Sequence, residues 1–461
     1  MKKVLLLNPP APVRVSRDYY CGHFTKGRYA WPPIDLLVLS GFLAEEFEVH
    51  VLDAVAEGLG GTRAHARIDA VRPDAVVSLV SGICWSSDIA LLEEVKRRHG
   101  CPVVVSGDLP RAEPRQALAS ASCIDAVILD FTDNEVLLFL AGQRRSGCRN
   151  VVTRDDTDVT PSRGKNGFCV PLPRHDRFPL HCYHVPMILH HPFCAVLTDY
   201  GCPFACRFCY MKGVGHRRRD LHNVGEELAM VRSLGIRELM VADQSFGSAR
   251  SHALAVCDAI RSVGQGRFGW FASIRVDAMD AEMLAAMRAA GCHTILVGVE
   301  TPTQAVLDRF EKGIDAAAAK AAFERAKAAG MRILAHFMVG LDGEDAVSLR
   351  KLIDFSIALD PDMASFNVPM PAWGPSPGGQ VEREKQENGE EVLPGTMLPP
   401  APKSRCLSRD EIHRARDRAV RRFYLRPRFL VRQLCSVRSP YHLRTLFREG
   451  LHLVFNSVMR R

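Results

Sequence analysis

The chain has 461 residues, of which 47% are hydrophobic and 24% charged, and its formal net charge is +8. This length and composition predict a globular protein of two or three domains and exclude a largely disordered one. No run approaches the ~20 uninterrupted apolar residues that a membrane helix needs. The short apolar run at the start is stopped by Pro9 and Pro10, so we expect no signal peptide and a cytoplasmic location.

Residues 1–140 alternate strand-like and helix-like segments. Amphipathic stretches predict helices at 36–46, 64–71 and 89–99. Short runs rich in Val, Ile and Leu predict strands at 4–8, 47–53, 75–80, 102–106 and 126–129. Apolar strands separated by helices are typical of a parallel sheet, so we expect an α/β, doubly wound, Rossmann-like domain. Its ligands would bind beyond the carboxyl ends of the strands.

The remaining chain divides into three stretches. Residues 141–190 lack periodicity and are interpreted as a linker. Residues 191–375 contain six strand–helix units, which predict a partial (β/α)6 barrel that binds ligands at the carboxyl ends of its strands. Residues 376–461 form a loop and a basic C-terminal helical tail. From 401 to 461 there are sixteen Lys and Arg against four Asp and Glu, so most of the excess positive charge belongs to this tail.

Three of the fifteen cysteines, Cys202, Cys206 and Cys209, lie at tight spacing directly after a predicted strand. A [4Fe–4S] cluster normally takes four thiolates, so three from one loop would leave one iron open to another ligand. A zinc site would need four ligands, commonly from two close pairs, and no second pair accompanies this one. A zinc knuckle or three buried core cysteines are the alternatives to a cluster.

The spacing C-x3-C-x-F-C after a strand resembles the signature of the radical S-adenosylmethionine (SAM) superfamily. The resemblance implies a [4Fe–4S] cluster on Cys202, Cys206 and Cys209, with SAM bound at the open iron. It implies that an electron from the cluster cleaves SAM to a 5′-deoxyadenosyl radical. It also implies an electron donor such as flavodoxin or ferredoxin, and it assigns no further catalytic side chain.

The same resemblance places SAM contacts at the ends of the barrel strands. The aromatic residue before the third cysteine would line the adenine pocket, and the end of the second strand would hold the amino group, although the GGE of many relatives is absent there. The third strand would contact the ribose. The fourth ends in a pattern close to the family's GxE, whose glutamate could instead be a structural partner of a barrel cation. The residues implied are Phe208, Asp243, Gln244, Ser273, Arg275, Gly298 and Glu300.

The N-terminal domain resembles the cobalamin-binding domains of B12-dependent radical SAM enzymes, on the segments 7–10, 32–37 and 51–54. The resemblance implies that cobalamin delivers a methyl group. The D-x-H-x-x-G motif that supplies a cobalt ligand in many such domains is absent, and the glycine-rich turns are altered. The implied contacts to the cobalamin tail are Ser78, Ser81 and Gly107. A cofactor-free Rossmann-like domain that shapes the substrate pocket is the alternative.

We therefore expect a cobalamin-dependent radical SAM methyltransferase that acts on a small molecule such as a tetrapyrrole, a lipid or a natural product. A radical SAM oxidoreductase or cyclase without methyl transfer is the second hypothesis. A non-catalytic iron–sulfur or nucleic-acid-binding protein is a distant third.

Two basic segments allow more than one interpretation. The run Arg217–Arg219 is interpreted as a solvated turn, or else as a contact to substrate or to the SAM carboxylate. The tail at 421–430 alternates Arg with apolar residues, which suits packing on the barrel or peripheral contact with an anionic membrane. Because the tail has no recognised nucleic-acid-binding fold, we expect no nucleic-acid partner.

Overall fold

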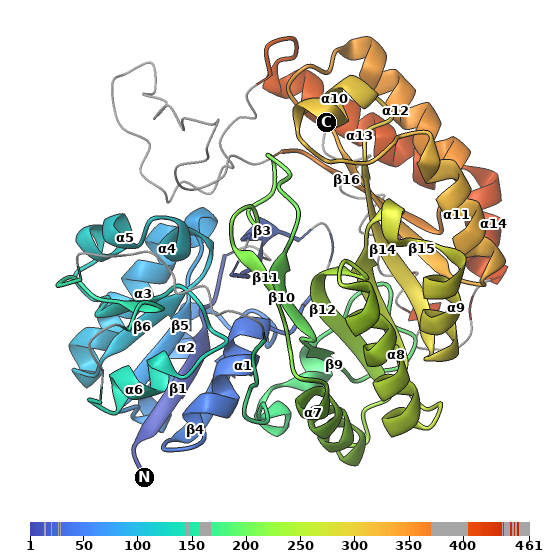
Figure 1. Cartoon of the computed structure of the whole chain (residues 1–461). Helices are drawn as coiled ribbons and strands as arrows, with labels where there is room; N and C mark the ends of the chain where they lie inside the picture. The colour runs from blue at the N-terminus through green and yellow to red at the C-terminus, as the bar shows by residue number, and fades with distance from the viewer. Residues whose placement is uncertain are drawn as a thin grey trace. The chain divides into compact units, whose positions relative to one another are not determined.

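The structure is a computed structural model. It describes the whole chain except residues 13–14, 20, 26, 28, 144–147, 157–166, 370–403, 436, 438–442, 445–446, 448–449 and 451–461. The described residues form two compact units (Figure 1). The first contains residues up to 185 together with 217–235. The second contains 186–216, 236–369 and the described residues from 404 onward.

The first unit is built on a six-stranded sheet whose order is β4-β1-β5-β6-β7-β8. The first five strands of this order are parallel, and β8 pairs with β7 antiparallel. Their order is that of a doubly wound domain, which confirms the predicted Rossmann-like fold. The strands are β1 (Lys3–Asn8), β4 (Glu48–Asp53), β5 (Ala75–Leu79), β6 (Val103–Ser106), β7 (Ala126–Ile128) and β8 (Val151–Val152).

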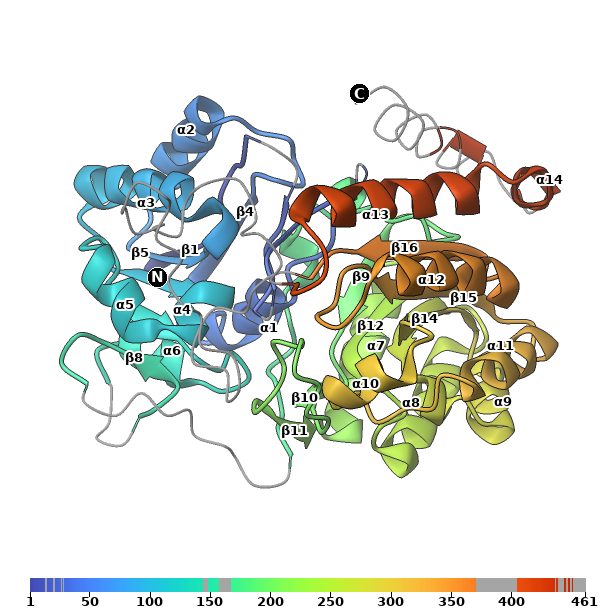
Figure 2. The ribbon, with the colours of Figure 1, turned by 90° about the horizontal axis from the view of Figure 1, so that it is seen from above.

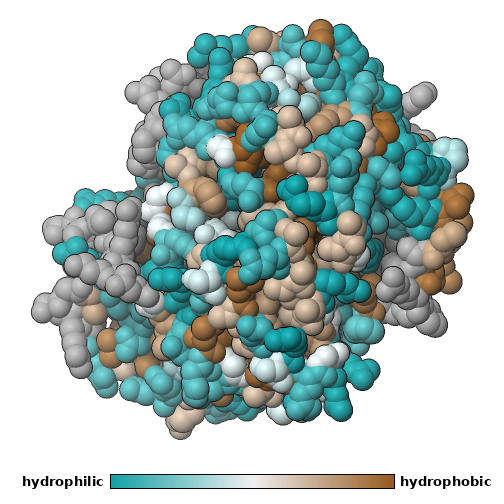
Figure 3. Space-filling model, turned by 45° about the vertical axis from the view of Figure 1, so that its right-hand side comes forward, coloured by the Kyte–Doolittle hydropathy of each residue, from teal (hydrophilic) through white to brown (hydrophobic). Residues whose placement is uncertain are grey.

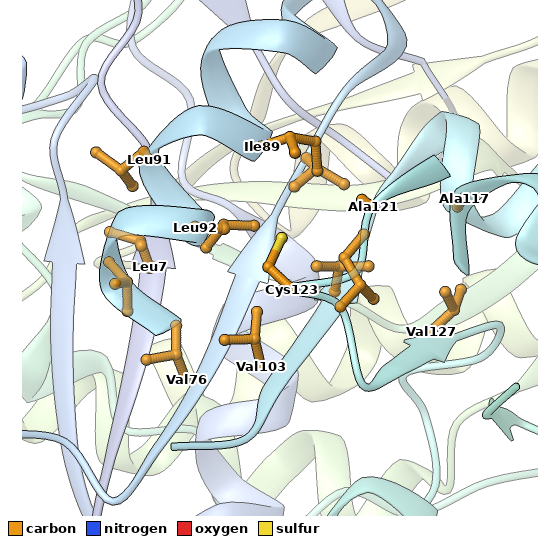
Figure 4. Close-up of a cluster of buried hydrophobic side chains, with 14 of the residues drawn as sticks. Leu7, Val76, Ile89, Leu91, Leu92, Val103, Ala117, Ala121, Cys123 and Val127 are labelled. Carbon is orange, nitrogen blue, oxygen red and sulfur yellow. The ribbon is translucent and has the colours of Figure 1, made fainter. Parts of the chain in front are cut away.

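Helices cover both faces of this sheet. On one face, Leu7, Val76 and Val103 of the strands pack in one cluster with Leu92 and Ala117 of two helices (Figure 4). On the other face, α1 is buried along its whole length, which explains why its residues are almost uniformly apolar. The helices are α1 (Ile34–Leu43), α2 (Gly61–Val71), α3 (Trp85–His99), α4 (Asp108–Ala112), α5 (Pro114–Ser120) and α6 (Glu135–Leu140). A hairpin of β2 (Val15–Ser16) and β3 (His23–Phe24) follows β1.

Two of the three consecutive arginines at 217–219 are not solvated. Arg219 is buried and pairs with Glu227 of α7 (Leu221–Ser233), and the ring of His175 lies 2.7 Å from the same carboxylate. Arg217 pairs with Asp130. The solvated-turn interpretation is therefore wrong for Arg217 and Arg219, because both side chains are largely removed from solvent and paired with carboxylates.

The second unit contains a six-stranded, fully parallel sheet in the order β16-β15-β14-β13-β12-β9 (Figure 2). The sheet does not close, which confirms the predicted partial barrel. Its strands are β9 (Phe193–Val196), β12 (Glu238–Phe246), β13 (Gly269–Ile274), β14 (Cys292–Glu300), β15 (Arg332–Met338) and β16 (Met363–Asn367). Its helices are α8 (Arg250–Gly264), α9 (Ala281–Ala289), α10 (Gln304–Arg309), α11 (Ala318–Ala328) and α12 (Ala346–Leu359).

The basic tail begins with α13 (Arg409–Tyr424), whose N-terminus is closed by a reciprocal capping box between Ser408 and Glu411. Phe423 is fully buried, and the Tyr424 hydroxyl donates to the Ala364 carbonyl at 2.7 Å. This helix therefore packs on the barrel. It is followed by α14 (Pro427–Cys435). Most of the loop expected before α13 lies outside the described residues.

None of the described helices combines the length and the apolar composition needed to cross a membrane. The face drawn in Figure 3 is mostly hydrophilic, with hydrophobic side chains in small scattered groups.

Candidate functional site

In the second unit, Cys202 ends β10 (Asp199–Cys202), and Cys206 and Cys209 lie in the loop that follows; residues 202–209 are called the cysteine loop below. The loop is anchored by the Arg207 amide, which donates to the Phe310 carbonyl at 2.9 Å, and by the Cys209 amide, which donates to the Cys206 carbonyl. β10 pairs with β11 (Gly215–Arg218). Gly201 permits this hairpin, because a Cβ there would lie 2.1 Å from the Gly215 carbonyl oxygen.

The thiols of this loop are shielded from water. Cys206 is buried, and Cys202 and Cys209 are half-buried. Burial raises the pKa of Cys202, and it raises that of Cys209 to about 11. Among the described residues, no three His, Cys, Asp or Glu side chains are placed so that they could hold one metal ion. The loop therefore does not present a ready-made mononuclear site. Three thiols on one loop fit a [4Fe–4S] cluster that keeps one iron open.

Arg275 lies directly against the cysteine loop. Its guanidinium carbon is 3.6 Å from the centroid of the Phe204 ring, and its Nη1 is 3.9 Å from the Cys206 sulfur. The guanidinium also donates to the Lys312 carbonyl and to Asp277, which fixes its orientation. The arginine that the family resemblance assigned to the ribose thus places a positive charge beside one of the thiols.

A buried ion pair occupies the end of β14. The Lys312 ammonium donates to the Glu300 carboxylate at 2.6 Å, and both side chains are about 8% exposed. Glu300 has a φ of 65°, a left-handed conformation that costs a non-glycine residue roughly 1 kcal/mol or more. A Cβ at Gly298 would lie 2.6 Å from the Glu300 carboxylate oxygen, so a larger residue there would displace the carboxylate. Lys312 also lies 5.6 Å from the ring centroid of Phe208.

The Asp243 side chain is buried and hydrogen-bonded within the protein. Its carboxylate accepts from the backbone amides of Thr198 and Asp199 and from the Thr198 hydroxyl, which ties β12 to the chain after β9. Burial, together with the neighbouring Asp199, raises the pKa of Asp243 to about 8. Burial also raises the pKa of Asp199, whose carboxylate faces the His216 ring at 3.0 Å.

Four of the seven residues implied for SAM therefore gather beside the cysteine loop and around Lys312. These are Phe208, Arg275, Gly298 and Glu300. Gln244 and Ser273 are half-buried on β12 and β13. Asp243 faces Thr198 instead. Sequence patterns did not indicate Lys312, which belongs to no recognisable motif, or Phe204, which occupies an unspecified position between Cys202 and Cys206.

In the first unit, the residues implied for the cobalamin tail are already engaged. The Ser78 hydroxyl donates to the Leu79 carbonyl at 3.0 Å, and the Ser81 hydroxyl donates to Asp108 at 3.3 Å. A Cβ at Gly107 would lie 1.9 Å from the Val80 carbonyl oxygen. Glycine is thus needed at position 107 because the backbone of Val80 lies close to it, and not because a ligand does.

Comparison with known proteins agrees with this arrangement. Residues 196–356 match the family model of the radical SAM superfamily. An uncharacterized methyltransferase of Pyrococcus horikoshii is 27% identical over 450 residues, 94% of each chain. The anaerobic magnesium-protoporphyrin IX monomethyl ester cyclase of Cereibacter sphaeroides is 28% identical over 232 residues, 49% of this chain and 38% of its own.

Among solved structures, the radical SAM methyltransferase TsrM of Kitasatospora setae, with cobalamin and a [4Fe–4S] cluster bound, superposes with a TM-score of 0.61. It is 19% identical, and the match covers 80% of this chain and 72% of TsrM. A second structure of TsrM holds tryptophan and a SAM analogue. The shared fold spans both units of the chain. The chain thus contains a radical SAM domain at residues 196–356, preceded by a Rossmann-like domain, and it shares this fold with TsrM.

Proposed function

We propose that the protein is a cobalamin-dependent radical SAM methyltransferase that acts on a small molecule. The observation that carries the proposal is the convergence of the cysteine loop, Arg275 and the Glu300–Lys312 pair at the carboxyl ends of the barrel strands. The relative that matches 94% of the chain is named as a methyltransferase, which supports methyl transfer as the outcome.

Each residue of the site has a role in this proposal. Cys202, Cys206 and Cys209 would hold a [4Fe–4S] cluster, which when bound would supply the electron for the cleavage of SAM to methionine and a 5′-deoxyadenosyl radical. Arg275 offsets negative charge beside Cys206. Glu300, held in place by Lys312, and the half-buried Gln244 and Ser273 offer polar groups to SAM, and Phe208 offers an apolar surface to its adenine.

Cobalamin, when bound, would supply the methyl group. The Rossmann-like fold and the cobalamin-containing TsrM structure support it. Ser78, Ser81 and Gly107 do not fit a nucleotide tail. The two serine hydroxyls already donate hydrogen bonds within the chain, and the Val80 backbone occupies the space beside Gly107. A small one-electron carrier such as flavodoxin or ferredoxin would reduce the cluster.

Product analysis tests the proposal. The protein is purified without oxygen, reconstituted with iron and sulfide, reduced, and incubated with SAM, methylcobalamin and an extract of small molecules from the source cells. A methyltransferase forms both 5′-deoxyadenosine and S-adenosylhomocysteine, and S-adenosylhomocysteine disappears when cobalamin is omitted. Formation of neither product, with a fully loaded cluster, would contradict the proposal.

A second candidate is a radical SAM cyclase or oxidoreductase without methyl transfer. It is favoured by the similarity of about half of the chain to the magnesium-protoporphyrin ester cyclase. The same assay separates the two hypotheses, because a cyclase would form 5′-deoxyadenosine without S-adenosylhomocysteine.

A further inference from the structure

The switch point of the N-terminal sheet is filled by the chain itself. β1 and β5 are neighbours from which the connections leave in opposite directions, and ligands of such sheets bind beyond the carboxyl ends of these strands. Here the buried Arg17 guanidinium lies at this place. It donates to the Asn8 side chain at 3.1 Å, to the Pro9 carbonyl at 2.8 Å and to both oxygens of Asp88 at 2.9 and 2.6 Å.

Gly22 lies against the segments that follow β5 and β6. Its amide donates to Asp108 at 2.8 Å, and the same carboxylate accepts from the Gly82 amide and the Ser81 hydroxyl. A Cβ at position 22 would lie 1.8 Å from the Ser81 hydroxyl oxygen, so the backbone of Gly22 fills the space above β5 and β6. A ligand group could enter there only by displacing this backbone.

Tyr19 covers the rest of the edge. It is buried, and its ring meets that of Phe131, which follows β7, edge-on at 4.9 Å. Its carbonyl accepts from Arg111 at 2.9 Å. The described residues of 15–24, called the edge strap below, thus contact the segments that follow β1, β5, β6 and β7.

The edge under the strap is acidic. Asp53, Asp88 and Asp108 are buried there, and Arg17 and Arg111 are the cations that the structure places beside them. Burial raises the pKa of Asp53 and Asp88 to about 6 each, and it also raises the pKa of Asp108. A phosphodiester would meet these carboxylates there, and the guanidiniums of Arg17 and Arg111 already bind groups of the chain.

We propose that the edge strap fills the place of the nucleotide tail of cobalamin, so that this chain holds a corrinoid by its ring and does not recognise the tail. The ligand class is therefore a corrinoid with or without its phosphate, ribose and base. This inference rests on the proposed use of a corrinoid.

Equilibrium dialysis of the full-length protein against hydroxocobalamin and against cobinamide, which is the same corrinoid without the nucleotide tail, tests the inference. We expect dissociation constants within about threefold of each other. Cobalamin binding that is tighter by about tenfold or more would overturn the inference and leave the proposed function standing. Binding of neither corrinoid would overturn both.

A variant distinguishes two cases. In the first, the edge strap stays in place when a corrinoid binds; in the second, the strap opens and Arg17 binds the phosphate of the tail. The double change Arg17→Met and Asp88→Asn removes both charges of the pair together, and circular dichroism verifies its fold. We expect the affinities for cobalamin and cobinamide to change by the same factor. A selective loss of cobalamin binding would show that Arg17 contacts the tail and would overturn the inference.

Discussion

The Lys312 ammonium and the Glu300 carboxylate form a buried ion pair at 2.6 Å, at the end of β14 in the radical SAM barrel. Glu300 adopts a left-handed backbone conformation there, so the pair holds a strained residue at the predicted SAM site.

Removing one partner should leave a buried charge uncompensated. We expect Lys312→Met to lower the free energy of unfolding by about 3 kcal/mol and to weaken SAM binding. Adding Glu300→Gln to Lys312→Met should restore part of the stability but not the SAM affinity. Denaturant unfolding and SAM binding by calorimetry measure the two effects. Arg309→Met, which removes an exposed pair with Asp342, is the control and should cost at most about 1 kcal/mol.

Arg275 should tune the electron affinity of the cluster. A positive charge beside the Cys206 sulfur stabilises the reduced, more negative cluster, so Arg275→Leu should lower its midpoint potential by on the order of 50 mV. A redox titration followed by electron paramagnetic resonance measures this shift. The exposed Arg261→Leu should leave the potential unchanged. An unchanged potential in Arg275→Leu would show that the guanidinium does not lie beside the cluster.

Arg219 should be a stability residue of the first unit. Burial alone would raise the pKa of Glu227, but Arg219 and His175 outweigh burial and lower that pKa. The buried carboxylate is therefore charged, and its charge is compensated by these partners. We expect Arg219→Met to lower the free energy of unfolding by about 3 kcal/mol. Arg218→Met, one residue earlier on an exposed side chain, should change it by less than about 0.5 kcal/mol. Equal effects of the two changes would contradict the buried pairing.

Asp35 should make the protein less stable as pH rises. Its side chain is fully buried, and burial raises its pKa to about 7, well above the value in an unfolded chain. The folded form therefore binds a proton that the unfolded form releases, and the associated stability is present at pH 4 and lost as pH rises through 7.

The substitution Asp35→Asn removes that titration. We expect the variant to be more stable than the unsubstituted protein at pH 8, by about 1 to 2 kcal/mol, and the difference to shrink toward pH 4. Unfolding curves at several pH values measure it, with the exposed Asp258→Asn as the control. A difference that is the same at pH 4.5 and pH 8 would contradict the raised pKa.

Local patterns made much of the fold and part of the site predictable. The strands of both parallel sheets are apolar runs between helices, and the three cysteines lie close together in the sequence. Glu300 was indicated by the resemblance of 298–300 to the family's GxE pattern at the end of the fourth barrel strand. In contrast, β8 has two residues, too few to show a period, and its pairing with β7 depends on the tertiary fold.

Long-range pairing explains the other differences between prediction and structure. Arg219 looked solvated because nothing in the sequence shows that it is buried and paired with Glu227, whose carboxylate also meets the distant His175. Lys312 lies on a loop that only the barrel brings to Glu300. Ser81 looked available to a ligand because nothing in the sequence shows that Gly22 and Asp108 meet beside it.

In the proposed enzyme, the cysteine loop holds a SAM-binding [4Fe–4S] cluster. Electron paramagnetic resonance and iron analysis of the reconstituted, reduced protein test it most directly. We predict about four irons per chain and a signal that changes when SAM is added. Cys206→Ala should lose both features, and Cys194→Ala, at a buried cysteine of β9, should keep them. An unsubstituted protein without a cluster, or a Cys206→Ala variant that keeps the full iron content and the SAM-dependent signal, would contradict the claim.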